Sequence, residues 1–295
     1  MARVRSCTFS VFPLPLDLKH RGAMQRANGE TPRLVVFVGL AGCLFLTLLL
    51  LTACGSAADR TLEQTIERTY ALDPTADIRI SNRDGSIRIY GSDTVEMKLQ
   101  AIKKAYTAER LNDIVISVAA QPNSISIETK YPLKKAWGFS DRSGTVDYVV
   151  VVPQAAQISR LELENGEVLV EGMRGGKVKA RLGSGRLFGH NCFSDLDLAV
   201  MSGNLTLAYD WWEESKFSAE AKVVDGHALA FLPSDAGFHL IAEAVHGKIA
   251  NDFAEKEQRQ GGPVHKIDMR IGESPEAEIK IHAADGNIRI AETNP

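Results

Sequence analysis

Two aspartates separated by one residue are the best candidates in this sequence for acid–base chemistry. Asp195 and Asp197 lie in FSDLDLAV, whose alternation of apolar and polar residues is typical of a strand. Residues i and i+2 of a strand point to one face, about 6.6–6.8 Å apart, which falls within the ~5–9.5 Å between the carboxylates of a glycosidase. A solvated strand face has the same pattern, so the pair permits a carbohydrate-active enzyme without requiring one.

Other catalytic motifs are absent from the sequence. It contains no G-x-S-x-G, H-E-x-x-H, Walker or C-x-x-C motif. GGKVKARLGSG is rich in glycine, but no helix follows it to offer N–H groups to a phosphate. No two histidines have the i, i+4 spacing of a helical metal site; those after Cys54 are His190, His227, His239, His246, His265 and His282. We therefore expect no catalytic residue, no cofactor and no metal.

Aromatic residues are the better candidates for ligand contact. YDWWEESKF places Tyr209, Trp211, Trp212 and Phe217 close together. Consecutive side chains of a strand point to opposite faces, so at most one of the two tryptophans can enter a core. The other would be exposed or covered by the loop, and an exposed tryptophan is a common stacking platform for sugars and proteins. Trp211 and Trp212 are therefore possible ligand contacts; the alternative is that the pair only caps a corner of the fold.

The N-terminal residues indicate export and lipid attachment. Leu34–Cys54 reads LVVFVGLAGCLFLTLLLLTAC, which has no charge before the cysteine and follows Arg26 and Arg33. A basic region followed by an apolar run is typical of a signal peptide, although this run could also span a bilayer. LTAC resembles the lipobox of bacterial lipoproteins, whose cysteine becomes the lipidated N-terminus. We expect a signal peptide over residues 1–53, with a possible true start at Met24, and a lipidated tether over 54–60 that carries palmitate on Cys54.

Cleavage before Cys54 changes the charge and the cysteine count. Six of the 34 basic and two of the 37 acidic residues precede it, so 28 basic and 35 acidic residues remain, a net charge of about −7. Nucleic-acid binding needs concentrated positive charge, so we expect no such partner. With Cys54 acylated, Cys192 has no disulfide partner. Because Cys192 lies between Phe188 and Phe193, we expect it to be a small buried hydrophobe.

A short sequence motif recurs along the chain and predicts the elements that position these residues. DGSIRI at Asp84 and DGNIRI at Asp285 differ at one position, and related phrases lie between them. Their glycines are Gly85, Gly166, Gly185, Gly203, Gly226, Gly247 and Gly286, at intervals of 81, 19, 18, 23, 21 and 39 residues. Most intervals are close to multiples of about 20, and such self-similarity is typical of repeat architectures.

One repeat unit has a simple physical explanation. Asp-Gly, Asn-Gly and Ser-Gly form turns, and the alternating residues that follow send one set of side chains to a core. A strand of five residues cannot bury its face alone, so neighbouring units must stack. We predict an all-β fold with a β-solenoid or β-helix-like repeat of about 20 residues over 159–295. The alternative is an antiparallel sandwich with hairpin turns at these glycines.

Residues 61–158 form a less regular β portion. We expect two strands around Pro74, a third in TVEMKLQAIKKA, and one short helix in TAERLND with Thr107 as its N-cap. A strand pair should turn at Gln121–Asn123, and Val146–Pro153 should form an apolar strand ended by its proline.

These residues resemble the bacterial putative-adhesin domain, a family of unknown function found in envelope proteins. The family pattern is a Y-x-V-x-V-P strand followed by G-x-V-x-V-x-G units with G-S-G between them. The residues at these places are Tyr148, Val150, Val152, Pro153, Gly166, Val168, Val170, Gly172, Gly183, Ser184 and Gly185. The resemblance extends over about Ile66–Ile290 and implies a right-handed, solenoid-like all-β domain at the cell surface.

Together these features predict a non-enzymatic cell-envelope lipoprotein. A membrane anchor at Cys54 would present the domain for adhesion, scaffolding or binding of a glycan or protein partner. Gly55 is not the aspartate that retains lipoproteins in the inner membrane, which favours the outer membrane or cell surface. A carbohydrate-active β-helix enzyme, a polysaccharide lyase or hydrolase, is the alternative.

Overall fold

The computed structural model describes residues 61–132, 144–254, 264–273 and 275–293 of the chain. All of them belong to one compact unit, Asp59–Pro295. The predicted signal peptide and the predicted lipidation site Cys54 lie outside the described residues.

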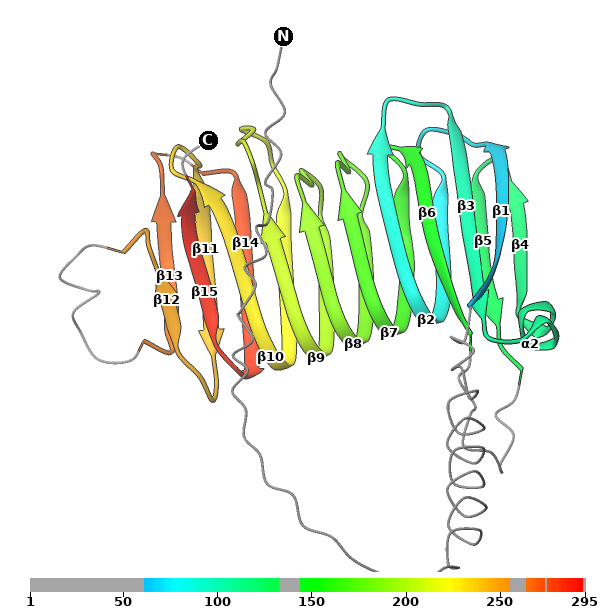
Figure 1. Cartoon of the computed structure of the whole chain (residues 1–295). Coiled ribbons are helices and arrows are strands. Elements are labelled where there is room, and N and C mark those ends of the chain that lie inside the picture. Colours follow the sequence, from blue (N-terminus) through cyan, green and yellow to red (C-terminus); the bar gives the residue numbers. More distant parts are fainter. Residues whose placement is uncertain (1–60, 133–143, 255–263, 274, 294–295) are drawn as a thin grey trace, which may run out of the picture. The chain divides into compact units, whose positions relative to one another are not determined.

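The described chain is all-β with one short helix, as the sequence predicted (Figure 1). The elements in chain order are β1 (Leu62–Ala71), β2 (Asp77–Ser92), β3 (Glu96–Ala105), α2 (Ala108–Asp113), β4 (Val115–Gln121), β5 (Ser124–Lys130), β6 (Thr145–Pro153), β7 (Gln157–Glu171), β8 (Val178–His190), β9 (Leu196–Ala208), β10 (Ser218–Pro233), β11 (Phe238–Ala244), β12 (Ile249–Asn251), β13 (Lys266–Ile271), β14 (Ala277–Asp285) and β15 (Ile288–Thr293).

The strands form one open sheet whose central members are parallel. Its order is β1-β3-β6-β2-β7-β8-β9-β10-β14-β11-β13, with β4, β5, β12 and β15 paired off this path. β2, β7, β8, β9 and β10 lie side by side in this order, and each pairs in parallel with the next one in the sheet. A parallel pair needs a crossover between its strands, so the chain must return across the domain after every strand.

A glycine lies inside each of these long strands and pairs with the glycine of the next strand. Gly85 is opposite Gly166, which is opposite Gly185; the register continues to Gly203 and Gly226. These glycines have φ between 128° and 136°, which side chains disfavour. The repeated phrase therefore marks a bend within a strand, and the alternative of hairpin turns at these glycines is wrong.

No side chain fits in this column of glycines. A Cβ placed on Gly166, Gly185, Gly203 or Gly226 would lie 1.8–2.0 Å from the carbonyl oxygen of the preceding glycine. Real Cβ atoms do not approach oxygen so closely, so both the left-handed φ and the packed backbone require glycine here.

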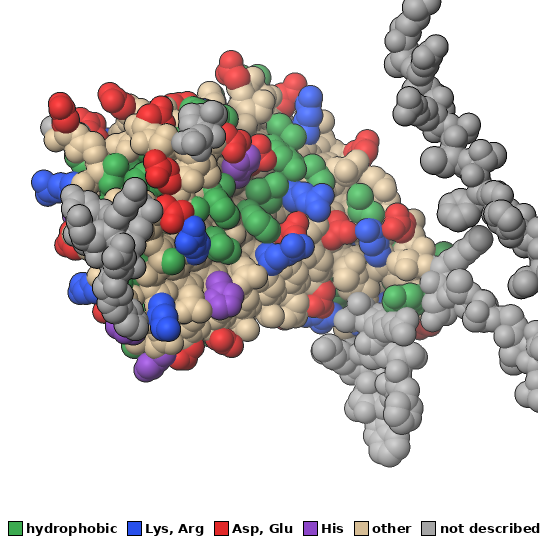
Figure 2. All heavy atoms as spheres, turned by 60° about the vertical axis from the view of Figure 1, so that its left-hand side comes forward, with side chains coloured by type: hydrophobic (Ala, Val, Ile, Leu, Met, Phe, Trp, Pro, Cys, Tyr) green, Lys and Arg blue, Asp and Glu red, His purple; other side chains and the backbone are tan. Residues whose placement is uncertain are grey.

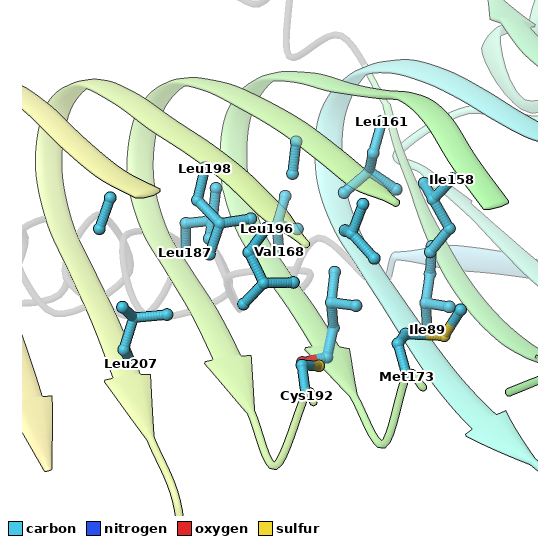
Figure 3. Packing of buried hydrophobic residues seen from close by; sticks show 14 of the residues in the cluster. Ile89, Ile158, Leu161, Val168, Met173, Leu187, Cys192, Leu196, Leu198 and Leu207 are labelled. Atoms are coloured by element: carbon cyan, nitrogen blue, oxygen red, sulfur yellow. The ribbon is translucent and has the colours of Figure 1, made fainter. Parts of the chain in front are cut away.

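The bend divides each long strand into halves that face each other across the core. In β2, Asp77–Ser81 pairs with β5 and Gly85–Ser92 pairs with β6. Alternate side chains of both halves point inward, and Ile78, Ile80, Ile87 and Ile89 are fully buried. Figure 3 shows the same arrangement further along, where Leu198 from the first half of β9 and Leu187 from the second half of β8 point toward each other. Strands of both predicted parts, 61–158 and 159–295, contribute to this core.

The C-terminal strands depart from chain order. β14 and β15 insert between β10 and the pair β11 and β12, so Gly286 follows Gly226 in the column and Gly247 lies beyond it. Along the chain Gly247 precedes Gly286, so the order in the sheet is the reverse of the order in the sequence. β14 lies between β10 and β11, and β13 pairs antiparallel with the outer side of β11.

Antiparallel strands occupy the N-terminal end of the sheet. β1 pairs with β3, and β3 with β6, while β4 and β5 form the predicted hairpin at Gln121. The short helix α2 begins after Thr107, whose Oγ1 accepts a hydrogen bond of 3.1 Å from the backbone N–H of Arg110. The predicted N-cap is therefore confirmed.

Replacing a glycine of the column should destabilise the domain severely. Gly203→Ala would add the strain of a left-handed φ and a Cβ 2.0 Å from the Gly185 oxygen, for a total loss of about 4 kcal/mol. Gly175→Ala is the matched control, because Gly175 also has a left-handed φ, 83°, but nothing lies within 4 Å of its Cβ; it should cost only about 1–2 kcal/mol. Urea unfolding of the full chain measures both, and equal losses would contradict the close-packed column.

Candidate functional site at the aromatic rim

The predicted contact residues lie in the loop between β9 and β10, residues 209–217. This loop lies within the longest interval in the central run of glycines, the 23 residues between Gly203 and Gly226. It lies beside the preceding return loop, which contributes Asn191, Cys192 and Phe193. We call residues 209–217, together with Asn191, Cys192 and Phe193, the aromatic rim.

Trp212 belongs to the core side of the aromatic rim. Its ring centroid lies 5.4 Å from that of Tyr209 and 5.7 Å from that of Phe217. Tyr209 and Phe217 are buried, and Trp212 also contacts the ring of Phe238 at 5.7 Å. Because it packs against the buried rings of its own loop and of β11, Trp212 has a structural role.

Trp211 is the exposed member of the pair, with 44% of its surface accessible. Its indole Nε1 donates a hydrogen bond of 3.0 Å to Glu213, which forms an ion pair with Arg174. The Arg174 guanidinium lies 5.1 Å from the centre of the Phe193 ring, and this ring lies 6.3 Å from that of Trp211. The tryptophan ring is therefore held at the surface by contacts with the neighbouring return loops.

Asp210 presents a carboxylate directly before Trp211. Its Oδ2 lies 3.0 Å from Nδ2 of Asn191, which donates to it, and 3.0 Å from Nε2 of His190. The backbone N–H of Asp210 donates to Oδ1 of Asn191 at 2.8 Å. These hydrogen bonds from Asn191 and His190 lower the pKa of Asp210, so the carboxylate is ionised at neutral pH.

Asn191 is a structural residue of the rim that the sequence analysis missed. It is the only non-glycine residue in the described ranges with a left-handed φ, 49°. Asparagine tolerates this conformation better than most residues, and its buried side chain binds both the backbone and the carboxylate of Asp210. The supporting roles of Arg174, Glu213 and His190 were missed as well, because no sequence motif connects positions in two different loops and at the end of β8.

The aspartates considered for catalysis are engaged elsewhere. Oδ1 of Asp195 accepts the backbone N–H of Ser218 at 3.0 Å, and Oδ2 of Asp197 lies 2.6 Å from Nη2 of Arg181. Partial burial alone would raise the pKa of Asp197, but the hydrogen bond and charge of Arg181 outweigh it and lower the pKa. A carboxyl group that stays ionised cannot serve as a general acid at neutral pH.

A cavity of about 510 Å³, within the size range of ligand pockets, is lined in part by the same loop. Glu214 and Ser215 contribute to it, together with residues of the β10–β11 and β13–β14 connections. Figure 2 shows hydrophobic, acidic and histidine side chains close together on the surface toward the C-terminal end of the domain. Within the described ranges, no group of three or more His, Cys, Asp or Glu residues is placed to hold a metal ion. In the same ranges no helix is long and apolar enough to cross a bilayer.

Cys192 is the buried thiol that the sequence predicted. It is fully buried next to the rim, and its Sγ lies 3.4 Å from the carbonyl oxygen of Val170. Loss of hydration on burial raises the pKa of Cys192 to about 11. The thiol is therefore protonated and unreactive in the folded domain.

The chain has structural similarity to solved proteins but low identity to them. A putative cell adhesion protein from Clostridium sporogenes matches with 18% identity and a TM-score of 0.46, over 78% of this chain and all of that one. A putative adhesin from Bacteroides fragilis matches with 13% identity and a TM-score of 0.28, over 77% and 97% of the two chains. A putative lipid binding protein from Parabacteroides distasonis matches with 12% identity and a TM-score of 0.27, over 79% and 95%.

No family model matches the sequence. No curated protein matches it either.

Replacing Trp211 and replacing Trp212 should have different effects on the free energy of unfolding. Trp212→Ala removes a ring packed among Tyr209, Phe217 and Phe238, and should lower the free energy of unfolding by about 2–4 kcal/mol. Trp211→Ala removes an exposed ring and should change it by less than about 1 kcal/mol. Chemical denaturation of the full chain measures both. A larger loss for Trp211→Ala than for Trp212→Ala would reverse the two assignments.

Cys192 should resist thiol reagents in the native state. With a pKa of about 11, only about one molecule in a thousand carries the thiolate at pH 8, and the sulfur is also buried. We expect the full chain and its Cys192→Ser variant to take up the same number of iodoacetamide groups when folded. In denaturant the counts should differ by one. Rapid labelling of Cys192 in the folded chain would show that this part of the core opens readily.

Proposed function

We propose that the chain is a non-enzymatic lipoprotein of the bacterial cell envelope that presents a β-solenoid domain for adhesion or scaffolding. The observation that carries the proposal is the column of paired glycines, which stacks the bent strands in register over one continuous core. Such a stack offers a repeated outer surface, and the return loops are free to vary along it.

The repeat length supports the solenoid interpretation. Each central unit consists of a half-strand, a glycine bend, a second half-strand and a return loop, and successive glycines lie 19, 18 and 23 residues apart. We therefore propose a β-solenoid with a repeat of about 20 residues, ended at both edges by antiparallel strands. Those strands protect the parallel ones from pairing with other chains.

Lipid attachment at Cys54 would hold this domain at a membrane. Two or more acyl chains give stable anchoring, whereas one chain gives marginal binding. The lipobox-like LTAC and the preceding apolar run support this anchor, and the tether over residues 54–60 would connect it to β1. We place the protein at the outer membrane or cell surface, where an exposed rim can reach a glycan or protein partner.

The enzyme alternative has less support. A lyase or hydrolase needs acid and base groups that converge on the substrate. The best candidates, Asp195 and Asp197, are bound to Ser218 and Arg181. We therefore favour binding over catalysis.

Metabolic labelling tests the lipoprotein directly. Cells that express the full chain are fed an alkyne analogue of palmitate, and we expect labelled protein in the membrane fraction. Cys54→Ala should abolish the label. Cys43→Ala, which changes the other cysteine of the apolar run, should leave it unchanged. Persistent label on the Cys54→Ala variant, or none on the wild-type chain, would contradict the proposed anchor.

A further inference from the structure

We propose that the surface formed by Trp211 and Asp210 binds an uncharged saccharide, with the indole stacked on a pyranose ring and the carboxylate accepting its hydroxyl groups. This inference rests on the proposed function, because it names the ligand class that the presented domain recognises.

The core does not need the Trp211 ring. Tyr209, Trp212 and Phe217 already fill the space beneath the loop, while Trp211 keeps 44% of its surface in solvent. An indole at the surface offers a large, flat apolar face on which a ligand can stack. The C–H groups on one face of a pyranose are a suitable cover for a flat aromatic ring.

The ring is also held in place before any ligand arrives. Its Nε1 is bound to Glu213, and Glu213 is paired with Arg174 from the β7–β8 return loop. Arg174 in turn lies over the Phe193 ring. A fixed side chain loses little conformational entropy on binding, which matters for a ligand that offers only a small contact area.

Asp210 supplies the polar half of the site. One carboxylate oxygen, Oδ2, is bound by Asn191 and His190, which fixes the plane of the group. The side chain is 63% exposed, so its other oxygen can accept hydroxyl protons from a ligand. The left-handed φ of Asn191 is a conformational cost at the position that orients Asp210, and such costs cluster at functional sites.

The surrounding charges select among saccharides. Asp210 lies close to His190, which is also 3.5 Å from a carboxylate oxygen of Glu171, and Glu214 follows on the same loop. The nearby base Arg174 is already paired with Glu213. The loop also contains one exposed base, Lys216, but the acidic residues Asp210, Glu213 and Glu214 outnumber it. This excess of negative charge disfavours uronic acids and anionic lipid headgroups, and leaves uncharged sugars as the ligand class.

Calorimetric titration of the detergent-solubilised full chain tests this site. The neutral probes are cellotetraose, mannotetraose and tetra-N-acetylchitotetraose; tetragalacturonate and phosphatidylglycerol vesicles are the anionic ones. We expect at least one neutral probe to bind more tightly than both anionic probes. Trp211→Ala should weaken that binding at least tenfold, the loss typical of a central aromatic contact. Trp211→Phe should restore part of it, and Asp210→Asn should weaken it severalfold.

Met201→Ala is the matched control, because Met201 is 60% exposed and lies near the glycine bend rather than in a return loop. It should bind like the wild-type chain, and all variants should remain folded and melt within a few degrees of the wild-type chain. No binding of neutral probes at millimolar concentration, tighter binding of an anionic probe, or unchanged binding by Trp211→Ala would each overturn the saccharide site. None of these results affects the palmitate label, so the lipoprotein proposal is tested separately. Cleavage of a bound probe, seen by mass spectrometry, would instead overturn the non-enzymatic function.

Discussion

The close approach of glycine to glycine at the strand bends is the constraint on which this structure depends. At each bend the backbone of one strand occupies the place that a Cβ on the next strand would need. For the glycines from Gly166 to Gly226, an added Cβ would lie 2.0 Å or less from the carbonyl oxygen of the preceding glycine in the column. This contact fixes the register of the parallel strands, because a shift by one residue would place a side chain in the column. It also aligns the inward-pointing residues, since side chains alternate between faces from the glycine outward. One continuous core follows from many repeats of the same local geometry.

The same constraint decides where function can arise. The bend cannot accept a side chain, and alternate positions of each half-strand are needed for the core. The outer strand faces and the return loops remain free to vary. The β9–β10 loop contains the rim tryptophans, and the strands beside it stay in register on both sides of it. Extra residues in a return loop therefore add chemistry without disturbing the stack, which is how a repeated fold acquires a site.

Much of this fold could be predicted from the sequence because its signals are local. Glycine intervals, alternating residues and the Thr107 cap act through neighbouring backbone, and the strands and helix were found where these signals lie. The order of Gly247 and Gly286 in the column could not be predicted, because both sequence motifs fit any position in the stack. Only the pairing of β11 with β13 and β14 distinguishes the two positions. The roles of Trp211 and Trp212 were open for a similar reason: the partners Phe193, Arg174 and Phe238 come from other turns of the chain. The hydrogen bonds between Asn191 and Asp210 could not be predicted either, since an asparagine in a loop has no distinctive sequence pattern.

A distance between spin labels along the stack tests the in-register column most directly. Arg88 and Arg289 are exposed, and Leu169, Phe188, Thr206 and Leu229 lie between them in one row of paired residues. Five steps of about 4.8 Å place the labelled backbones about 24 Å apart. Pulsed electron paramagnetic resonance on the full chain with labels at these two positions should give a single narrow distribution near that distance. A broad distribution, or one centred well beyond 35 Å, would show that the glycines do not stack and would contradict this account.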